Sequence, residues 1–135
     1  MPIILDQALY NRIKRKAFDS TEGGVVVDLN AYLIPKVPKH HEIWKWSNPI
    51  QVRKMADKYL GKDIPVYISV NKGKKYMVQD PNGKWVHFGQ LKYEDYTKHQ
   101  DDKRRENYLT RTANMRGNWK DNKYSANNLS RNILW

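Results

Sequence analysis

Three short β-rich runs, separated by two strong turn sequences, constrain the fold of this chain more than any other feature. The runs cover residues 66–70, 75–79 and 84–88, and the turns read Asn71-Lys72-Gly73-Lys74 and Asp80-Pro81-Asn82-Gly83. Asn, Asp and Gly tolerate the left-handed backbone of tight turns, and Pro fixes φ. Turns this short join strands in antiparallel order. The sequence therefore predicts a three-stranded antiparallel meander.

A helix is predicted directly before the meander, over residues 49–60. Asn48 is a favourable N-cap residue and Pro49 occupies the first helical position. Val52, Ala56 and related apolar residues recur on one face of this helix. Gly61 stands where a C-cap glycine belongs.

A second helix is predicted after the meander, starting somewhere between Tyr93 and Asp101 and continuing to about Ala113. Thr97 and Gln100 have the spacing of a capping box. The meander and these helices predict an α+β fold: a small three-stranded antiparallel meander packed with two or three helices, plus an extended N-terminal arm. The final residues Ile133, Leu134 and Trp135 are too apolar for a free tail, so we expect this end to dock on the domain or on a partner.

The first 47 residues are interpreted as a basic helix followed by a proline-containing arm, and residues 48–135 as the α+β module. Asp6 caps a predicted helix whose apolar residues Leu5, Leu9, Ile13 and Ala17 lie at helical spacing. Residues 25–27 fit either a short buried strand or an apolar plug. The stretch YLIPKVPKHHEIWKW, residues 32–46, predicts an extended arm rather than a helix, because two prolines lie three residues apart.

The composition indicates a single domain with a polyanionic partner. The chain has 135 residues and a net charge of +11, and the excess of Lys and Arg runs through all parts of the sequence. Such charge attracts polyanions through counterion release, and it also suits a protein that fills gaps in an acidic assembly. Cysteine is absent, which excludes disulfides and thiolate catalysis and suits a reducing compartment. We expect no signal peptide and no membrane span.

One cluster of acidic residues and histidine follows the meander. If the second helix includes Asp95, then Asp95, His99, Asp102 and Glu106 share one face. Carboxylates beside an imidazole are a ligand set for a hard divalent cation, as in metal-dependent nucleases. The alternative is that the acids stabilise the helix start and pair with arginines. The positive excess of the chain favours this alternative, and no other catalytic or cofactor motif is present.

Basic residues interleaved with aromatic residues are the remaining functional signal. Exposed aromatic rings can stack on bases while Lys and Arg bind phosphates, although in a lean domain the same rings can form the core. The candidate nucleic-acid-binding residues are Arg12, Lys14, Arg15, Lys16, Lys74, Lys75, Lys84, Trp85, Arg104, Arg105, Arg111 and Lys120.

Several motifs from about residue 64 to residue 135 resemble one protein family. They are Val86-His87-Phe88-Gly89, Tyr93-x-Asp95-Tyr96-Thr97-x-His99-x-Asp101 or Asp102, Arg104-Arg105-x-x-Tyr108-x-x-Arg111, Trp119-Lys120, Leu129-Ser130 and Leu134-Trp135. Together they resemble small, functionally uncharacterised proteins encoded by large double-stranded DNA viruses of eukaryotes, the giant and algal viruses. The resemblance implies a viral origin and a compact module of sheet and helix, and it carries no catalytic assignment.

The expected function is therefore that of a non-enzymatic basic viral protein, a minor structural component of the virion. It would contact other virion or capsid proteins or packaged nucleic acid, and during infection it would occupy the host cytoplasm or viral factory. A DNA- or RNA-binding protein is the alternative, and a metal-dependent nuclease using Asp95, His99 and Asp102 is the third hypothesis. No cofactor and no small-molecule substrate are expected.

Overall fold

The computed structural model describes residues 2–4, 26–28 and 32–135. Two short strands, β1 (Pro2–Ile4) and β2 (Val26–Asp28), pair antiparallel with Ile3 opposite Val27. A strand therefore does form close to the predicted residues 25–27. The predicted basic helix with Leu5, Leu9, Ile13 and Ala17 lies outside the described residues.

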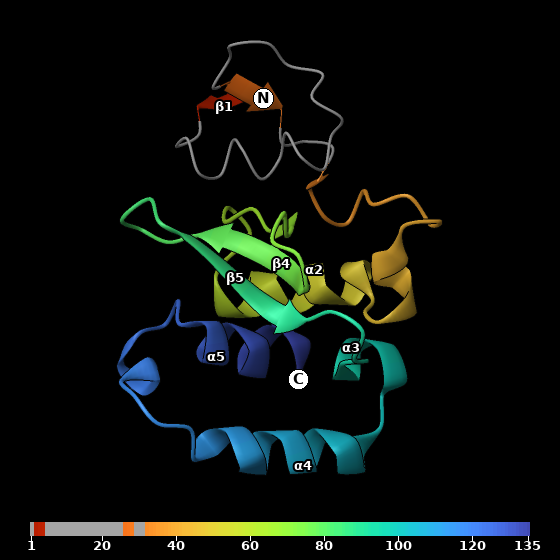
Figure 1. Ribbon diagram of the computed structural model, residues 1–135, viewed down its shortest axis with the longest axis vertical. Coiled ribbons are helices and arrows are strands. Elements are labelled where there is room, and N and C mark those ends of the chain that lie inside the picture. The colour runs from red at the N-terminus through yellow and green to blue at the C-terminus, as the bar shows by residue number, and fades with distance from the viewer. Residues whose placement is uncertain (1, 5–25, 29–31) are drawn as a thin grey trace.

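The predicted meander is confirmed. Strands β3 (Tyr67–Ile68), β4 (Lys74–Gln79) and β5 (Trp85–Gln90) form one antiparallel sheet in the order β3-β4-β5 (Figure 1). The second turn is closed by Asp80, whose Oδ1 accepts hydrogen bonds from the backbone N of Asn82 and of Lys84, both at 2.9 Å. Strand β3 has only two residues in the ladder, although residues 66–70 are all buried.

The helix before the meander also forms as predicted. Helix α2 (Pro49–Tyr59) begins after Asn48, whose side chain accepts hydrogen bonds from the backbone N of Ile50 and Gln51. Gly61 follows its C-cap with φ of 106°, a conformation that glycine adopts without steric cost. Val52 and Ala56 on its inner face are fully buried.

The helix after the meander is divided in two, whereas the sequence predicted a single helix. Helix α3 (Tyr96–His99) and helix α4 (Asp102–Ala113) are separated by Gln100, which has a left-handed backbone with φ of 56°. The predicted capping box is wrong, because the side chain that caps α4 is Asp101, whose Oδ1 accepts from the backbone N of Lys103 and Arg104. Thr97 is buried inside α3.

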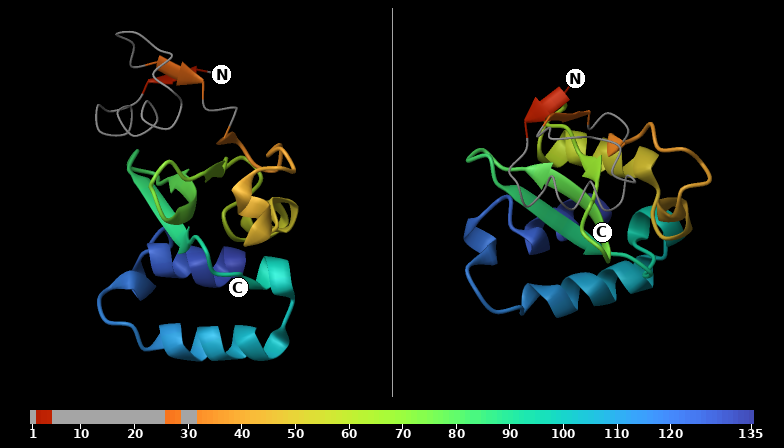
Figure 2. Two further views of the ribbon diagram at one scale, coloured as in Figure 1. Left: turned by 45° about the vertical axis from the view of Figure 1, so that its right-hand side comes forward. Right: turned by 45° about the horizontal axis from the view of Figure 1, so that its top comes forward.

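The C-terminal segment docks on the domain itself. Helix η3 (Trp119–Asp121) leads to α5 (Ala126–Leu129) and the continuous η4 (Ser130–Leu134). Leu129, Ile133 and Leu134 are at most 1% exposed. In Figure 1 and in the left view of Figure 2, α5 and η4 lie between the sheet and α4, which forms the outer edge of the molecule.

The segment before α2 belongs to the same core. Ile34, Val37 and Ile43 are buried with residues of the sheet, α2 and the C-terminal helices. The backbone N of Ile34 donates to Val66 O at 3.1 Å. The segment is not extended throughout, because Glu42–Lys45 form a short 3-10 helix, η2. These elements establish the predicted α+β class, whereas a domain division at residue 47 stays a prediction. In the described part of the chain, no helix is long and apolar enough to cross a bilayer.

Candidate nucleic-acid interface

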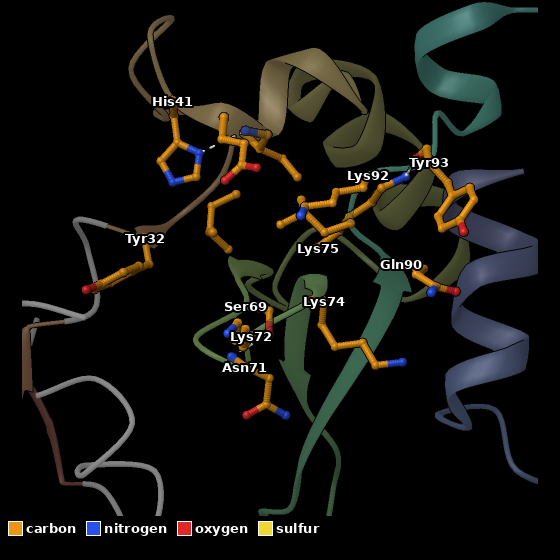
Figure 3. Close-up of a pocket in the computed structure, with 15 residues that line it drawn as sticks. Tyr32, His41, Ser69, Asn71, Lys72, Lys74, Lys75, Gln90, Lys92 and Tyr93 are labelled. Atoms are coloured by element: carbon orange, nitrogen blue, oxygen red, sulfur yellow. Dashed lines mark hydrogen bonds between the residues drawn. The ribbon is translucent and has the colours of Figure 1, made fainter. Parts of the chain in front are cut away.

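Two adjoining hollows lie where β4 begins and β5 ends. The loop hollow, of about 830 Å³, lies between η2, the turn 71–74 and the loop 91–93 (Figure 3). The helix hollow, of about 540 Å³, lies between the end of β5, α4 and the C-terminal helices. Both are lined by Lys74, Lys75, Gln90 and Tyr93. The hollows therefore form one continuous surface.

Cations dominate this surface. Lys72, Lys74 and Lys92 are exposed in the turn and the loop, and Arg104 and Arg111 are exposed on α4. The acidic residues that line the two hollows are Glu42 and Glu94. We call the five exposed cations together with Tyr93 the basic surface. Its charge would attract phosphate groups.

Tyr93 lines both hollows and is 65% exposed. Its backbone is fixed from several sides. Leu91 N donates to Gly73 O at 2.9 Å and Asp95 N donates to Trp46 O at 3.1 Å. The ammonium of Lys75 donates to Tyr93 O at 2.5 Å. Figure 3 shows Tyr93 and Gln90 on one side of the loop hollow, with Tyr32 and His41 on the opposite side.

The loop that presents Tyr93 contains a strained residue. Lys92 has a left-handed backbone with φ of 72°, which is uncommon for a residue other than Gly, Asn or Asp. Residues in such conformations are held by their surroundings and concentrate at functional sites. Here the backbone hydrogen bonds of Leu91 and Asp95 hold the chain on either side. The backbone conformation of Lys92 is therefore imposed by the fold and not by the preference of lysine itself.

A buried ion pair supports the basic surface from below. Lys75 Nζ lies 3.0 Å from Asp95 Oδ2, and their side chains are 3% and 1% exposed. The same ammonium donates to Trp46 O at 3.4 Å. Burial lowers the pKa of Lys75, and the charge and hydrogen bond of Asp95 offset part of that effect. Lys75 is therefore an internal support for the loop and not an exposed phosphate ligand.

The second oxygen of Asp95 continues the buried network. Asp95 Oδ1 accepts a hydrogen bond from Thr97 Oγ1. Thr97 Oγ1 in turn accepts from Asn48 N at 3.0 Å and lies 3.2 Å from Ser47 Oγ, and Ser47 Oγ accepts from the hydroxyl of Tyr76 at 2.7 Å. The network joins the start of α2, strand β4 and the start of α3 into one unit.

The structure does not bring Asp95, His99 and Asp102 together. The predicted shared helical face is wrong, because the chain breaks at Gln100. Asp95 faces Lys75, whereas Asp102 accepts from the hydroxyl of Tyr96 at 2.6 Å. His99 Nδ1 accepts from Asp101 N at 2.9 Å. In the described ranges no group of three or more His, Asp or Glu residues could hold a metal ion.

His99 packs against the C-terminal residue instead. Its ring centre lies 5.2 Å from that of Trp135, whose ring stacks on Tyr108 at 4.1 Å. Burial and the nearby Arg104 lower the pKa of His99. His87 is likewise a packed strand residue, with Nδ1 at 2.8 Å from Ser69 Oγ.

The other predicted binding residues lie apart from the basic surface. Lys84 and Trp85 are at the opposite end of the β4–β5 hairpin from Lys74, and the ring of Trp85 packs against Tyr67 at 5.7 Å. Lys120 lies over the ring of Trp119. Arg105 donates to Trp135 O at 2.5 Å. The predicted residues Arg12, Lys14, Arg15 and Lys16 lie outside the described residues.

Several residues of the interface were not among the predicted binding residues. These are Lys72, Lys92 and Tyr93 in the loops and Met115 beyond α4. The pair Lys92-Tyr93 is part of the pattern of interleaved basic and aromatic residues from which the candidates were drawn, and the turn sequence around Lys72 is a further visible signal. Met115 carries no comparable signal, because only the chain path brings it beside the sheet.

Comparison with known proteins finds one similarity, which covers part of the chain. Residues 64–112 match a family of unknown function, DUF5754. The matched stretch contains the meander, α3 and nearly all of α4. No curated protein and no solved structure matches the chain. The family description names neither a virus nor an activity, and it covers a shorter stretch than the expected 64–135.

Proposed function

We propose that this protein binds nucleic acid through the basic surface and catalyses no reaction on it. The observation that carries the proposal is the continuity of the two hollows. Lys74 and Tyr93 line both, so one exposed aromatic ring shares these hollows with cations from the turn, the loop and α4. Cationic grooves with exposed rings suit the phosphates and bases of nucleic acids.

Salt dependence provides the first test. Neutralising phosphates with five cations predicts a slope of log affinity against log salt of about −3.5 for single strands. Between about 50 and 200 mM salt, the affinity should fall about 100-fold, measured by fluorescence anisotropy with labelled DNA and RNA. Binding that is absent at the lower salt concentration would overturn the proposal.

Single substitutions localise the interface. Lys74→Ala and Arg111→Ala should each weaken binding and reduce the magnitude of the salt slope by about 0.7 to 1. Lys84→Ala is the matched control, since Lys84 is an exposed lysine on the same hairpin but outside both hollows. If Lys84→Ala weakens binding as much as Lys74→Ala, the interface lies elsewhere or is not localised.

A role as a minor virion component is the second proposal, and it rests on the resemblance to proteins of large DNA viruses. Two features motivated this role, the apolar residues of the arm and the apolar C-terminal end. Both are buried in the domain's own core, the arm through Ile34, Val37 and Ile43. The geometry therefore favours nucleic acid over threading between capsid subunits. Retention of the protein on nuclease-treated, salt-washed particles would support the virion role, and its complete loss into the wash would contradict it.

A further inference from the structure

The helix hollow differs chemically from an ordinary phosphate-binding surface. Its floor includes Phe88 and Leu134, which are at most 1% exposed. Its rim includes Tyr93 and Met115, which are 65% and 53% exposed. Exposed apolar side chains of this size gathered at one concave site indicate a ligand that is itself partly apolar.

Polar groups around this apolar centre can form hydrogen bonds with the edge of a flat ring. The side-chain amides of Gln90 and Asn107 line the hollow and make no hydrogen bond to another described residue. Amides of this kind both donate and accept, as the edges of nucleobases require. Lys74, Arg104 and Arg111 surround the same hollow, whereas Glu94 supplies its one acidic side chain.

The charge of the rim decides between possible occupants. Arg104 is the partner of Glu94, at 3.4 Å with both side chains well exposed, so this pair neutralises little of the surrounding charge. An uncharged apolar ligand would leave the remaining cations without partners. A nucleotide unit satisfies the apolar centre, the amides and the cations together, and a volume of about 540 Å³ lies within the range of small-ligand sites.

We infer that the helix hollow holds one unstacked base of a single-stranded nucleic acid, with Tyr93 as its stacking platform. The inference rests on the proposed nucleic-acid binding and specifies its substrate class. In a duplex the bases are stacked and paired, so they cannot enter a hollow without being unstacked. The protein therefore prefers single strands, and the preference depends on bases and not only on phosphates.

The test compares three labelled ligands of equal length by anisotropy: a single strand of mixed sequence, the same strand annealed to its complement, and an abasic single strand. The single strand should bind about tenfold more tightly than either of the others, because stacking on an aromatic side chain gives a difference of this order. Tyr93→Ala should reduce single-strand binding about tenfold and leave binding of the abasic strand unchanged. Tyr93→Phe keeps the aromatic ring and should therefore retain the single-strand binding of the parent protein.

Two controls keep the result interpretable. Lys84→Ala should leave the preference unchanged, and Met115→Ala should reduce it in the same direction as Tyr93→Ala. Both Tyr93 and Met115 are largely exposed, so these variants should fold. A free nucleoside monophosphate should compete only weakly; if it binds as tightly as the strand, the ligand is a free nucleotide and the strand is overturned as substrate.

The outcomes distinguish this inference from the broader proposal. Equal binding of the base-bearing and abasic strands, or a duplex bound as tightly as the single strand, overturns the base subsite and leaves the basic surface standing. Failure to bind any of the three strands at low salt overturns both.

Discussion

At the scale of single residues, Lys75 shows how a cation can act from inside the fold. Its ammonium, with Asp95, joins Trp46 O and Tyr93 O, two carbonyls that are far apart in the sequence. Removing an ammonium and a carboxylate from water is costly, and the attraction between them only offsets that cost. The role of the pair is therefore positional, since it fixes the backbone from which Tyr93 projects.

Breaking this pair should be far more damaging than breaking an exposed one. Asp95→Asn keeps the size of the side chain but leaves the buried ammonium without an anion, which should cost about 3–5 kcal/mol of unfolding free energy. Glu94→Gln removes the neighbouring exposed pair with Arg104 and should cost about 1 kcal/mol or less. Urea unfolding measures both variants. Equal costs would show that the Lys75–Asp95 pair is no more important than a surface contact.

At the scale of elements, the end of β5 and helix η4 approach each other so closely that a side chain at residue 89 would crowd its neighbours. A Cβ at Gly89 would lie 2.7 Å from Leu134 Cδ1 and 3.1 Å from Lys75 Cβ. The backbone there also has φ of 80°. This close packing seats the C-terminal helix against the sheet and closes the floor of the helix hollow.

Gly89→Ala should therefore destabilise the protein for two reasons, left-handed backbone strain and overpacking. Gly117→Ala is the matched control, because Gly117 has φ of 97° but no atom within 4 Å of its would-be Cβ. Both variants should lose about 1–2 kcal/mol from strain, and only Gly89→Ala should lose a further 1–3 kcal/mol or so from overpacking. Thermal or urea unfolding gives the difference. Equal losses would mean that η4 moves aside easily.

Helix α4 is attached mainly by polar and aromatic contacts. The one buried residue of α4 is Thr112, which is 6% exposed. Arg131 Nη1 donates to Leu109 O and Thr112 Oγ1, both at 2.6 Å, and Tyr108 stacks on Trp135 with ring planes 7° apart. Such an attachment leaves the Arg-rich face of α4 exposed beside the hollow, which is what a phosphate-binding wall requires.

At the scale of the whole molecule, the elements that the sequence predicted well are those specified by neighbouring residues. Asn48, Pro49 and Gly61 mark the ends of α2 through their own backbone preferences. Asp80 and Gly83 likewise close the turn between β4 and β5. Local signals of this kind determine the element and its ends together.

The features that the sequence did not predict depend on distant contacts. Gln100 adopts a left-handed conformation that its residue type does not favour, so no local pattern marks the break between α3 and α4. Lys75 pairs with a carboxylate twenty positions away, which changes it from a surface cation into a buried one. The helix hollow is lined by both Lys74 and Trp135, which only the assembled fold brings to the same site.

The abundance of tyrosine gives the whole molecule a pH dependence. Several tyrosines have raised pKa values, and burial is the main cause for all of them except Tyr96. For Tyr96 the main cause is its hydrogen bond with Asp102. The effect is largest for Tyr76, whose pKa lies well above 10.0. The described tyrosines with raised pKa values are Tyr32, Tyr59, Tyr67, Tyr76, Tyr96 and Tyr108.

The sign of this dependence follows from the protons bound in each state. Above pH 10 the unfolded chain loses phenolic protons that the folded state keeps, so the unfolding free energy should fall as the pH rises. Tyr76 alone should contribute about 1.4 kcal/mol per pH unit in this range. Lys75 acts in the opposite direction, because its lowered pKa makes the folded state bind fewer protons than the unfolded chain just below the ordinary lysine pKa of 10.5. One lysine set against six tyrosines should reduce the slope without reversing it.

Urea unfolding at a series of pH values between neutrality and strong alkali measures this slope. Tyr76→Phe should cost about 1 kcal/mol at neutral pH, because its hydrogen bond to Ser47 is lost, and it should make the alkaline slope shallower. If Tyr76→Phe and the parent protein lose stability in parallel above pH 10, the buried hydroxyl of Tyr76 does not control the alkaline limit of the fold.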